Sequence, residues 1–168
     1  MVEIDPGTFL HYHRPYAIGE KMKKIYLFAL VLILAACSFG GTEFSRNQQK
    51  WNNANITHYR FQLTVSCFCA FRDKMPLTVE VQNGQLVSMT YSDGTPVSAD
   101  DQTNMGFNQY ATIDNLFGYT AQRMKDADEV KVTYDPEYGF PVEVNIDAIK
   151  DAVDDELYLS VSGFEKIQ

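Results

Sequence analysis

The sequence lacks the short motifs that most often identify an enzyme. It contains no glycine-rich phosphate-binding loop, no recognisable Ser-His-Asp set and no cysteine or histidine spacing typical of a zinc site. Its acidic segments also lack the alternate-residue oxygen ligands and the glycine of an EF-hand loop. No motif in the sequence therefore assigns an activity, and we expect no cofactor.

Basic residues are scarce. The chain has 14 Lys and Arg against 22 Asp and Glu, which gives a formal net charge of −8 at pH 7. An acidic surface repels phosphate backbones, so nucleic acid is excluded as an expected partner. There is also no low-complexity tract and no mid-chain linker, which indicates a single domain over residues 45–168.

The chain has no apolar run long enough to cross a bilayer, which takes roughly 20 residues. Its longest uncharged apolar run, residues 25–36, follows Lys21, Lys23 and Lys24. A basic start, a short apolar middle and small residues before a cleavage point describe a secretory signal peptide, which we assign to residues 22–36. The alternative is a buried core helix, but such a helix normally carries polar residues on one face, and this run has none.

The signal peptide ends in Leu34-Ala35-Ala36-Cys37, which resembles the lipobox of bacterial lipoproteins. The resemblance implies that diacylglycerol is linked to the Cys37 thiol, that the chain is cut before Cys37 and that the new amino terminus is acylated. Two or three acyl chains anchor firmly, because each buried CH₂ contributes about 0.8 kcal/mol. We therefore expect residues 37–44 to be a lipidated tether. Ser38 is not the aspartate that retains Gram-negative lipoproteins at the inner membrane, which favours the periplasmic face of the outer membrane in a Gram-negative source.

Residues 1–21 are polar and aromatic, unlike the start of a signal peptide, whereas the residues from Met22 onward read as a typical one. Residues 19–22 can also be encoded with a ribosome-binding sequence just ahead of the Met22 codon. We therefore expect translation to begin at Met22, so that residues 1–21 are an extension outside the translated protein.

The pattern after residue 44 predicts an α+β domain. Ser45 is expected to cap a helix reaching about Asn55, with Trp51 on its core side. Residues 57–71 alternate clearly between apolar and polar side chains and predict a half-buried strand. A hairpin is expected at Asn83-Gly84, with a three-residue loop and a bulge at Gly84 that sets Val79 opposite Val87 and Leu77 opposite Met89. In the strand of residues 57–71, one face holds Tyr59, Phe61, Leu63, Val65, Cys67, Cys69 and Phe71.

Residues 92–110 read as a polar connection, mostly loop. Thr112 then starts a helix, and three more strands follow Asp128. We therefore expect two helices packed on one face of a roughly six-stranded antiparallel sheet, in the element order αβββ-αβββ. The apolar stripe of the second helix comprises Ile113, Leu116, Phe117, Ala121 and Met124.

Several stretches together resemble an uncharacterised family of bacterial envelope proteins, often lipid-anchored, that is known only as a domain of unknown function. The resemblance covers most of residues 48–165 and includes the Cys67-Phe-Cys69 strand, Asn83-Gly84 and Leu116-Phe117. Its most specific part is the Tyr134-Asp-Pro-Glu-Tyr-Gly-Phe-Pro141 turn. The resemblance supports an envelope location and implies no activity.

Cys67 and Cys69 form the first candidate site, with three interpretations. In a flat strand their Cα atoms would be roughly 6.6–6.8 Å apart, against a usual disulfide span of about 4.4–6.8 Å, so a disulfide requires the strand to bend. The alternatives are two buried thiols, or a redox or soft-metal site, since Cys-x-Cys can hold copper(I) or zinc. A Cys–His catalytic pair is disfavoured because His58 lies on the opposite face of the strand.

The carboxylates offer a weaker calcium site shared between loops, or simply a solvated acidic rim. Glycoside hydrolysis by two of them has no support, because nothing selects a pair. The residues concerned are Asp93, Asp100, Asp101, Asp135, Glu137, Asp147, Asp151, Asp154, Asp155 and Glu156.

In the turn before Pro141, Tyr138 and Phe140 are expected at the exposed tip, where they would suit a protein contact; simple turn packing is the alternative. The sequence thus predicts a lipid-anchored, non-enzymatic envelope protein that binds a protein or peptide partner. A small-ligand or metal-binding lipoprotein that uses Cys67 and Cys69 or the acidic loops is the second choice, and an enzyme is the third.

Overall fold

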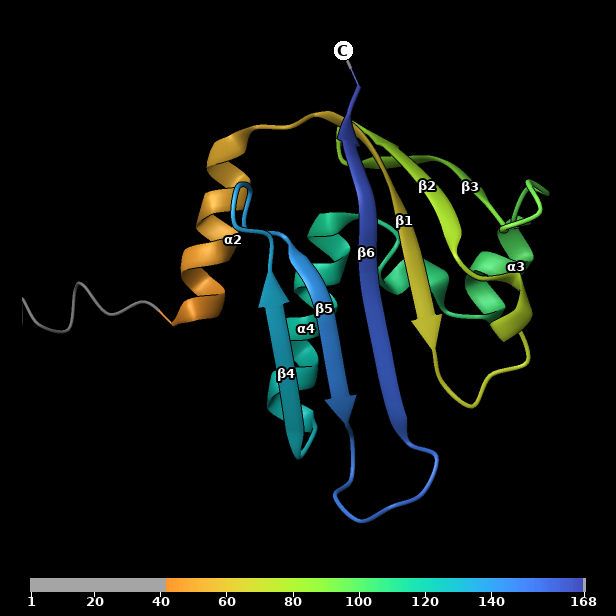
Figure 1. Ribbon diagram of the computed structural model, residues 1–168, viewed down its shortest axis with the longest axis vertical. Coiled ribbons are helices and arrows are strands. Elements are labelled where there is room, and N and C mark those ends of the chain that lie inside the picture. The colour runs from red at the N-terminus through yellow and green to blue at the C-terminus, as the bar shows by residue number, and fades with distance from the viewer. Residues whose placement is uncertain (1–41, 168) are drawn as a thin grey trace, which may run out of the picture. The chain divides into compact units, whose positions relative to one another are not determined.

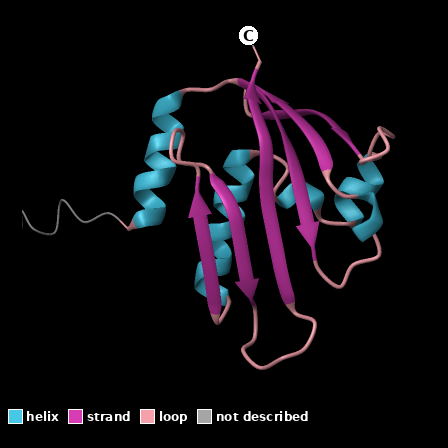
Figure 2. Cartoon of the chain, viewed as in Figure 1, coloured by secondary structure: helices cyan, strands magenta, loops and turns pink. Residues whose placement is uncertain are grey.

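The fold is built around a six-stranded antiparallel sheet, and the computed structural model describes residues 42–167 of the chain (Figures 1 and 2). The expected signal peptide, its expected lipobox and Cys37 lie outside the described residues. Within the described part, no helix is long and apolar enough to cross a membrane.

Helices and strands follow one another in two blocks. The first block holds α2 (Glu43–Ala54), β1 (His58–Ser66), η1 (Arg72–Lys74), β2 (Leu77–Gln82) and β3 (Gln85–Thr90). The second holds α3 (Ala99–Asn104), η2 (Phe107–Gln109), α4 (Ile113–Asp126), β4 (Glu129–Tyr134), β5 (Pro141–Asp147) and β6 (Glu156–Lys166). The α+β class and the six-stranded antiparallel sheet are confirmed. The expected element order is incomplete, because α3 and η2 lie in the connection that we expected to be mostly loop.

The strand order is β3-β2-β1-β6-β5-β4, so the last strand of the chain pairs with the first, at the centre of the sheet. β6 joins the two blocks by pairing with β1 on one side and β5 on the other. β3 and β4 are therefore the two edges of the sheet. Figure 1 shows α4 behind the half of the sheet that holds β4, β5 and β6.

The β2–β3 hairpin has a different register from the one expected. Asn83 and Gly84 both have positive φ, 50° and 74°, and form a two-residue loop closed by the Gln82–Gln85 pair. The expected three-residue loop is therefore wrong, because Asn-Gly suits the tight primed turn. The bulge lies instead at Val87 in β3, between the Val81–Leu86 and Glu80–Ser88 pairs. It sets Val79 opposite Met89, which is buried, and leaves Val87 55% exposed.

Each of α2, α3 and α4 begins at a capping side chain. Thr42, not Ser45, caps α2, because its hydroxyl accepts the Ser45 N–H at 3.2 Å. Ser98 caps α3 in the same way, and the expected start of α4 at Thr112 is confirmed by the hydroxyl that accepts the Asn115 N–H at 3.0 Å. Such caps satisfy amide groups that the first helical turn leaves unpaired.

The core lies between the helices and one face of the sheet. Tyr59, Phe61, Leu63 and Val65 of β1 are buried, as the alternation predicts. Trp51 is buried as expected and packs edge-on against Tyr59, with ring centroids 5.4 Å apart. Each such apolar side chain contributes about 1.5–3 kcal/mol on burial. In α4, Ile113, Leu116, Phe117 and Thr120 are buried.

The predicted stripe of α4 is wrong at its end, because Met124 is 42% exposed. It lies in the last turn of the helix, over the edge strand β4, where no further strand of the described residues covers it. Thr120 is buried instead. Its hydroxyl donates to the Leu116 carbonyl at 2.7 Å and so needs no other hydrogen-bond partner.

Candidate functional site

An apolar groove runs beside the edge strand β4, and we call it the edge groove. It is a hollow of about 490 Å³ between the start of α2, the end of α4 and β4. It is lined by Thr42, Glu43, Phe44, Ala121, Met124, Lys125, Val130, Val132 and Tyr134.

The groove exists because β4 is the last strand of its sheet. Val130, Val132 and Tyr134 point to the helix side at every second position, and each is only half-buried. Phe44 forms one wall and is held by an edge-on contact with Phe117 of α4, with centroids 5.5 Å apart. An interior strand would have a neighbour whose side chains fill this space; an edge strand has none.

The groove is apolar in its middle and carries charge at its lining residues Glu43 and Lys125. Burial raises the pKa of Tyr134 to about 12, and the negative charge of Glu43 adds to the rise. The Tyr134 hydroxyl therefore stays protonated at neutral pH and can donate a hydrogen bond. One side of the β4 backbone pairs with β5, and its other side has no strand partner in residues 42–167.

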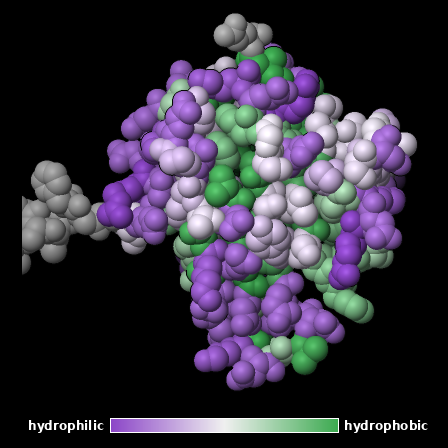
Figure 3. All heavy atoms as spheres, in the orientation of Figure 1, coloured by the Kyte–Doolittle hydropathy of each residue, from purple (hydrophilic) through white to green (hydrophobic). Residues whose placement is uncertain are grey.

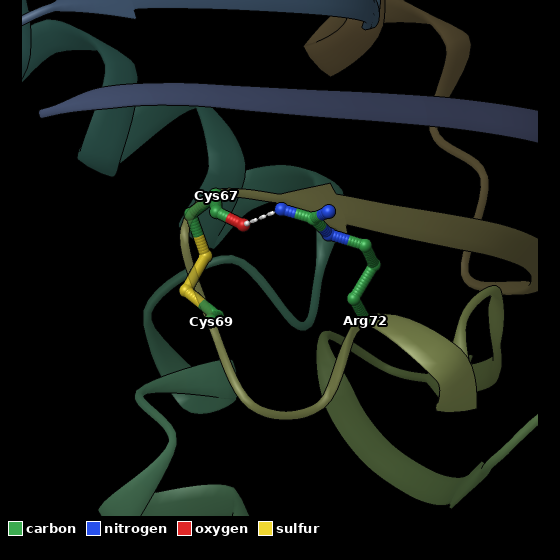
Figure 4. The surroundings of a disulfide bond; sticks show 3 residues. All are labelled: Cys67, Cys69 and Arg72. Carbon is green, nitrogen blue, oxygen red and sulfur yellow. Dashed lines mark hydrogen bonds between the residues drawn. A yellow bond between two sulfur atoms is a disulfide. The ribbon is translucent and has the colours of Figure 1, made fainter. Parts of the chain in front are cut away.

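Cys67 and Cys69 lie in the loop after β1, because the strand ends at Ser66 rather than continuing to Phe71 as the alternation suggests. The two residues are joined as a disulfide, with Cα atoms 5.1 Å apart. The bend that a disulfide requires is present, since the Cys69 N–H donates to the Cys67 carbonyl at 2.8 Å. Arg72 Nη2 also donates to this carbonyl, at 3.2 Å (Figure 4).

The loop around the disulfide is open to solvent. Phe68, between the two cysteines, is 80% exposed. A second hollow of about 490 Å³, which we call the disulfide hollow, is lined by Phe68, Cys69, Ala70, Arg72 and Asp73. Both cysteine sulfurs are bonded to each other, so in this state neither is a metal ligand.

The turn between β4 and β5 does not present two exposed aromatic rings. Phe140 is only 2% exposed and packs on Trp51 and Phe164, with centroids 6.0 and 4.6 Å away. The expectation of exposure is therefore wrong for Phe140. Tyr138 is half-buried beside Phe164, and Lys166 Nζ lies 4.9 Å from its ring centre.

The reason is that the turn folds back onto α2. Gly139, at φ 82°, lies so close to this helix that an added Cβ would come within 2.6 Å of the Asn47 carbonyl oxygen. Lys50 Nζ donates to the Pro136 carbonyl at the same contact. The most specific stretch of the family resemblance is thus explained by packing of the turn on a helix.

His58 and the cysteines lie at opposite ends of β1. The His58 Nε2 and Glu80 Oε1 atoms are 2.8 Å apart on the outer face of the sheet, and Arg60 also contacts Glu80 and Glu165, at 3.0 and 3.1 Å. The hydrogen bond from His58, followed by the one from Arg60, lowers the pKa of Glu80. This geometry gives a Cys–His pair no support.

Acidic side chains hold the backbone of the β5–β6 connection, one from the connection itself and one from the residue before β4. Asp155 Oδ2 accepts the Ile149 N–H at 2.6 Å, and Asp128 Oδ2 accepts the Lys150 N–H at 2.8 Å. Within residues 42–167, no three His, Cys, Asp or Glu side chains come together to hold a metal ion. Figure 3 shows hydrophilic side chains gathered over this lower end of the sheet.

The main residues of the edge groove were not singled out from the sequence. The alternation of Val130, Val132 and Tyr134 predicts a strand, but it carries no sign that this strand is an edge. The exposure of Met124 was likewise not predicted, because Met124 falls on an apparently regular apolar stripe.

These features define an α+β domain with an open antiparallel sheet, a groove beside one edge and an exposed Cys-x-Cys disulfide loop. Residues 43–166 match a family of unknown function (DUF6174). The chain belongs to this family. No curated protein and no solved structure was found to be similar to it.

Proposed function

We propose that this protein is a lipid-anchored domain of the bacterial cell envelope that binds an extended polypeptide segment of a protein partner at the edge groove. The observation that carries the proposal is an apolar groove directly beside β4, one edge of which has no partner strand within residues 42–167. The lipobox of the sequence supports the envelope location.

The backbone of the partner would pair with β4. An edge strand leaves alternate N–H and C=O groups without a partner, and an added strand satisfies them while extending the sheet. Main-chain pairing of this kind supplies affinity with little dependence on sequence.

The side chains of the partner would supply the selectivity. Every second residue of an added strand faces the same side of the sheet, as Val130, Val132 and Tyr134 do. Apolar side chains at alternate positions of the partner would therefore enter the groove beside Phe44 and Met124. A segment with alternating apolar and polar residues fits best, and the Tyr134 hydroxyl adds a polar contact.

The binding test uses a labelled synthetic peptide of alternating Val and Thr, with the full-length protein in a fluorescence anisotropy titration. A charge in the groove is expected to weaken binding about tenfold, the equivalent of 1.4 kcal/mol, in Met124→Glu. The matched control is Val87→Glu, which places the same charge on the other edge strand at a similarly exposed residue.

Methylation of alternate peptide amides is expected to abolish binding when the methylated face is the one that pairs with β4. Methylation of the other alternate set is expected to leave binding unchanged. The proposal would be wrong if Met124→Glu and Val87→Glu bound the peptide equally well, or if the peptide bound neither the variants nor the unchanged protein.

The lipid anchor is tested separately by growing bacteria that express the protein with radiolabelled palmitate. We expect label on the unchanged protein and on Cys67→Ala, and none on Cys37→Ser. An uncut, unlabelled chain would contradict the anchor and leave the peptide-binding test unaffected.

A further inference from the structure

The Cys67–Cys69 disulfide holds no two elements of the fold together. It joins residues two positions apart in one loop, whereas a disulfide stabilises a fold more when it closes a long loop. The backbone hydrogen bond from the Cys69 N–H to the Cys67 carbonyl already closes the same turn. The disulfide therefore adds little to the stability of the fold, and a structural role does not account for it.

Both cysteines are half-buried and pack against the core, whereas Phe68 and Ala70 of the same loop are open to solvent. Cys69 lines the disulfide hollow, and the neighbouring Phe68 side chain is turned out to solvent, 80% exposed. Figure 4 shows the two sulfur atoms in a loop that projects from the end of β1. An incoming thiolate must approach the sulfur that it attacks along the S–S direction, and the hollow supplies space beside Cys69.

A cation lies beside the other cysteine. The Arg72 guanidinium is held at the Cys67 carbonyl, 3.2 Å from Nη2 to the oxygen. Arg72 also lines the hollow beside Cys69, and a positive charge close to a disulfide favours the thiolate that forms when the bond opens. Asp73 also lines the hollow and opposes this effect, whereas Lys74 is directed to the Tyr91 ring, 4.5 Å from its centre.

We propose that the Cys67–Cys69 disulfide is a thiol–disulfide exchange centre that oxidises a dithiol of a protein partner. A partner thiolate attacks Sγ of Cys69, the S–S bond breaks and Cys67 leaves as a thiolate. The second partner thiol, as a thiolate, then attacks the partner sulfur of the mixed disulfide, and Cys69 leaves.

The exchange is balanced. The partner loses two electrons and two protons and gains a disulfide, while Cys67 and Cys69 gain both and become thiols. A second exchange with a protein disulfide returns the centre to its oxidised form. The inference does not depend on the edge groove or on the peptide that it binds.

The test uses the full-length chain carrying Cys37→Ser, so that Cys67 and Cys69 are its only cysteines. The probe is a synthetic peptide with two reduced cysteines separated by two residues. After acid quenching and alkylation, mass spectrometry counts the thiols on both molecules. We expect one peptide to be oxidised for each protein reduced, at a rate in the folded protein no lower than in the urea-unfolded protein.

The Arg72 variants separate this centre from a structural crosslink. Arg72→Gln is expected to slow the exchange about tenfold, and Arg72→Lys to restore most of the rate. The matched control Lys74→Gln removes a neighbouring cation and should leave the rate unchanged. Trapping should also be unequal, with Cys67→Ala forming more mixed disulfide through Cys69 than Cys69→Ala forms through Cys67.

Protection of the disulfide in the folded protein by tenfold or more relative to the unfolded chain would overturn the proposal. Equal rates for Arg72→Gln and Lys74→Gln would do so as well. If the cysteine variants do not fold, the exchange rates of the Arg72 variants and of Lys74→Gln test the proposal on their own.

Discussion

Gly139 is the residue at which the turn after β4 meets α2. It combines φ 82° with a neighbouring carbonyl that an added Cβ would approach to 2.6 Å. Gly94 has nearly the same φ, 84°, but an added Cβ there would meet nothing within 4 Å. Substitutions at these two glycines therefore distinguish the effect of backbone strain from the effect of a steric clash.

Gly139→Ala is expected to lower the free energy of unfolding by about 3 kcal/mol, since it adds a clash to the backbone strain. Gly94→Ala is expected to lower it by about 1 kcal/mol from the strain alone. Urea unfolding followed by tryptophan fluorescence measures both, because Trp51 packs on Phe140 beside this turn. Equal losses in the two variants would show that the contact with α2 is not tight.

At the scale of the elements, three carboxylates lie side by side where β4, β5 and β6 approach the β5–β6 connection. Asp147 pairs in register with Glu129 on one side and Glu156 on the other. Loss of hydration raises the pKa of Asp147, and the nearby acids, Asp155 first, add to the rise. The ionised Asp147 carboxylate is therefore unfavourable in the folded protein.

Asp147→Asn is expected to raise the melting temperature at pH 7. A raised folded-state pKa contributes stability that is present below the unfolded pKa and is lost as the pH rises through the folded pKa, so the gain should disappear near pH 3. Differential scanning calorimetry at the two pH values measures the change. Glu137→Gln, in the β4–β5 turn, is the control, and an equal gain in it would point to overall net charge instead.

Most elements could be predicted from local sequence because their signals are local. The alternation of Tyr59, Phe61 and Leu63 predicts β1, and the Thr112 cap predicts the start of α4. The two-residue turn of the β2–β3 hairpin could be predicted from Asn83-Gly84, but the bulge at Val87 could not, since it depends on which residues reach the core. The exposure predicted for Phe140 is wrong because its contacts, Trp51 and Phe164, are distant in sequence.

The candidate site was predicted in part. The Cys67 and Cys69 pair stands out in sequence, and the structure adds the end of β1 that allows the bond and the arginine beside it. The edge groove depends on β4 being the last strand of the sheet, which follows from pairing of β6 with β1. Such a long-range pairing is not encoded in the pattern of any single strand.

At the scale of the whole molecule, buried tyrosines are expected to limit stability at alkaline pH. Burial raises the pKa of Tyr110 and of Tyr134 to about 12, and it also raises the pKa of Tyr59, whose hydroxyl accepts the Ile113 N–H. In the unfolded chain a tyrosine releases its proton near pH 10. The unfolded state therefore binds fewer protons than the folded state above that pH.

The free energy of unfolding is expected to be unaffected by these tyrosines below about pH 10 and to fall steeply as the pH rises from there toward 12. Urea unfolding at half-unit steps from pH 9 to about 11.5 measures the slope. Tyr110→Phe should give a shallower fall, whereas Tyr158→Phe, on the outer face, should leave the slope unchanged. The same slope in all three proteins would refute this explanation.

The central position of β6 has a consequence for biosynthesis. β1, β2 and β3 can pair as soon as they emerge, but β1 keeps an open inner side until β6 arrives, and β5 does too. Because a chain is made from its amino-terminal end, both halves of the sheet stay incomplete until β6 has been made. The proposed envelope location requires export, and a chain exported through a translocation pore could complete its sheet only after β6 had passed through.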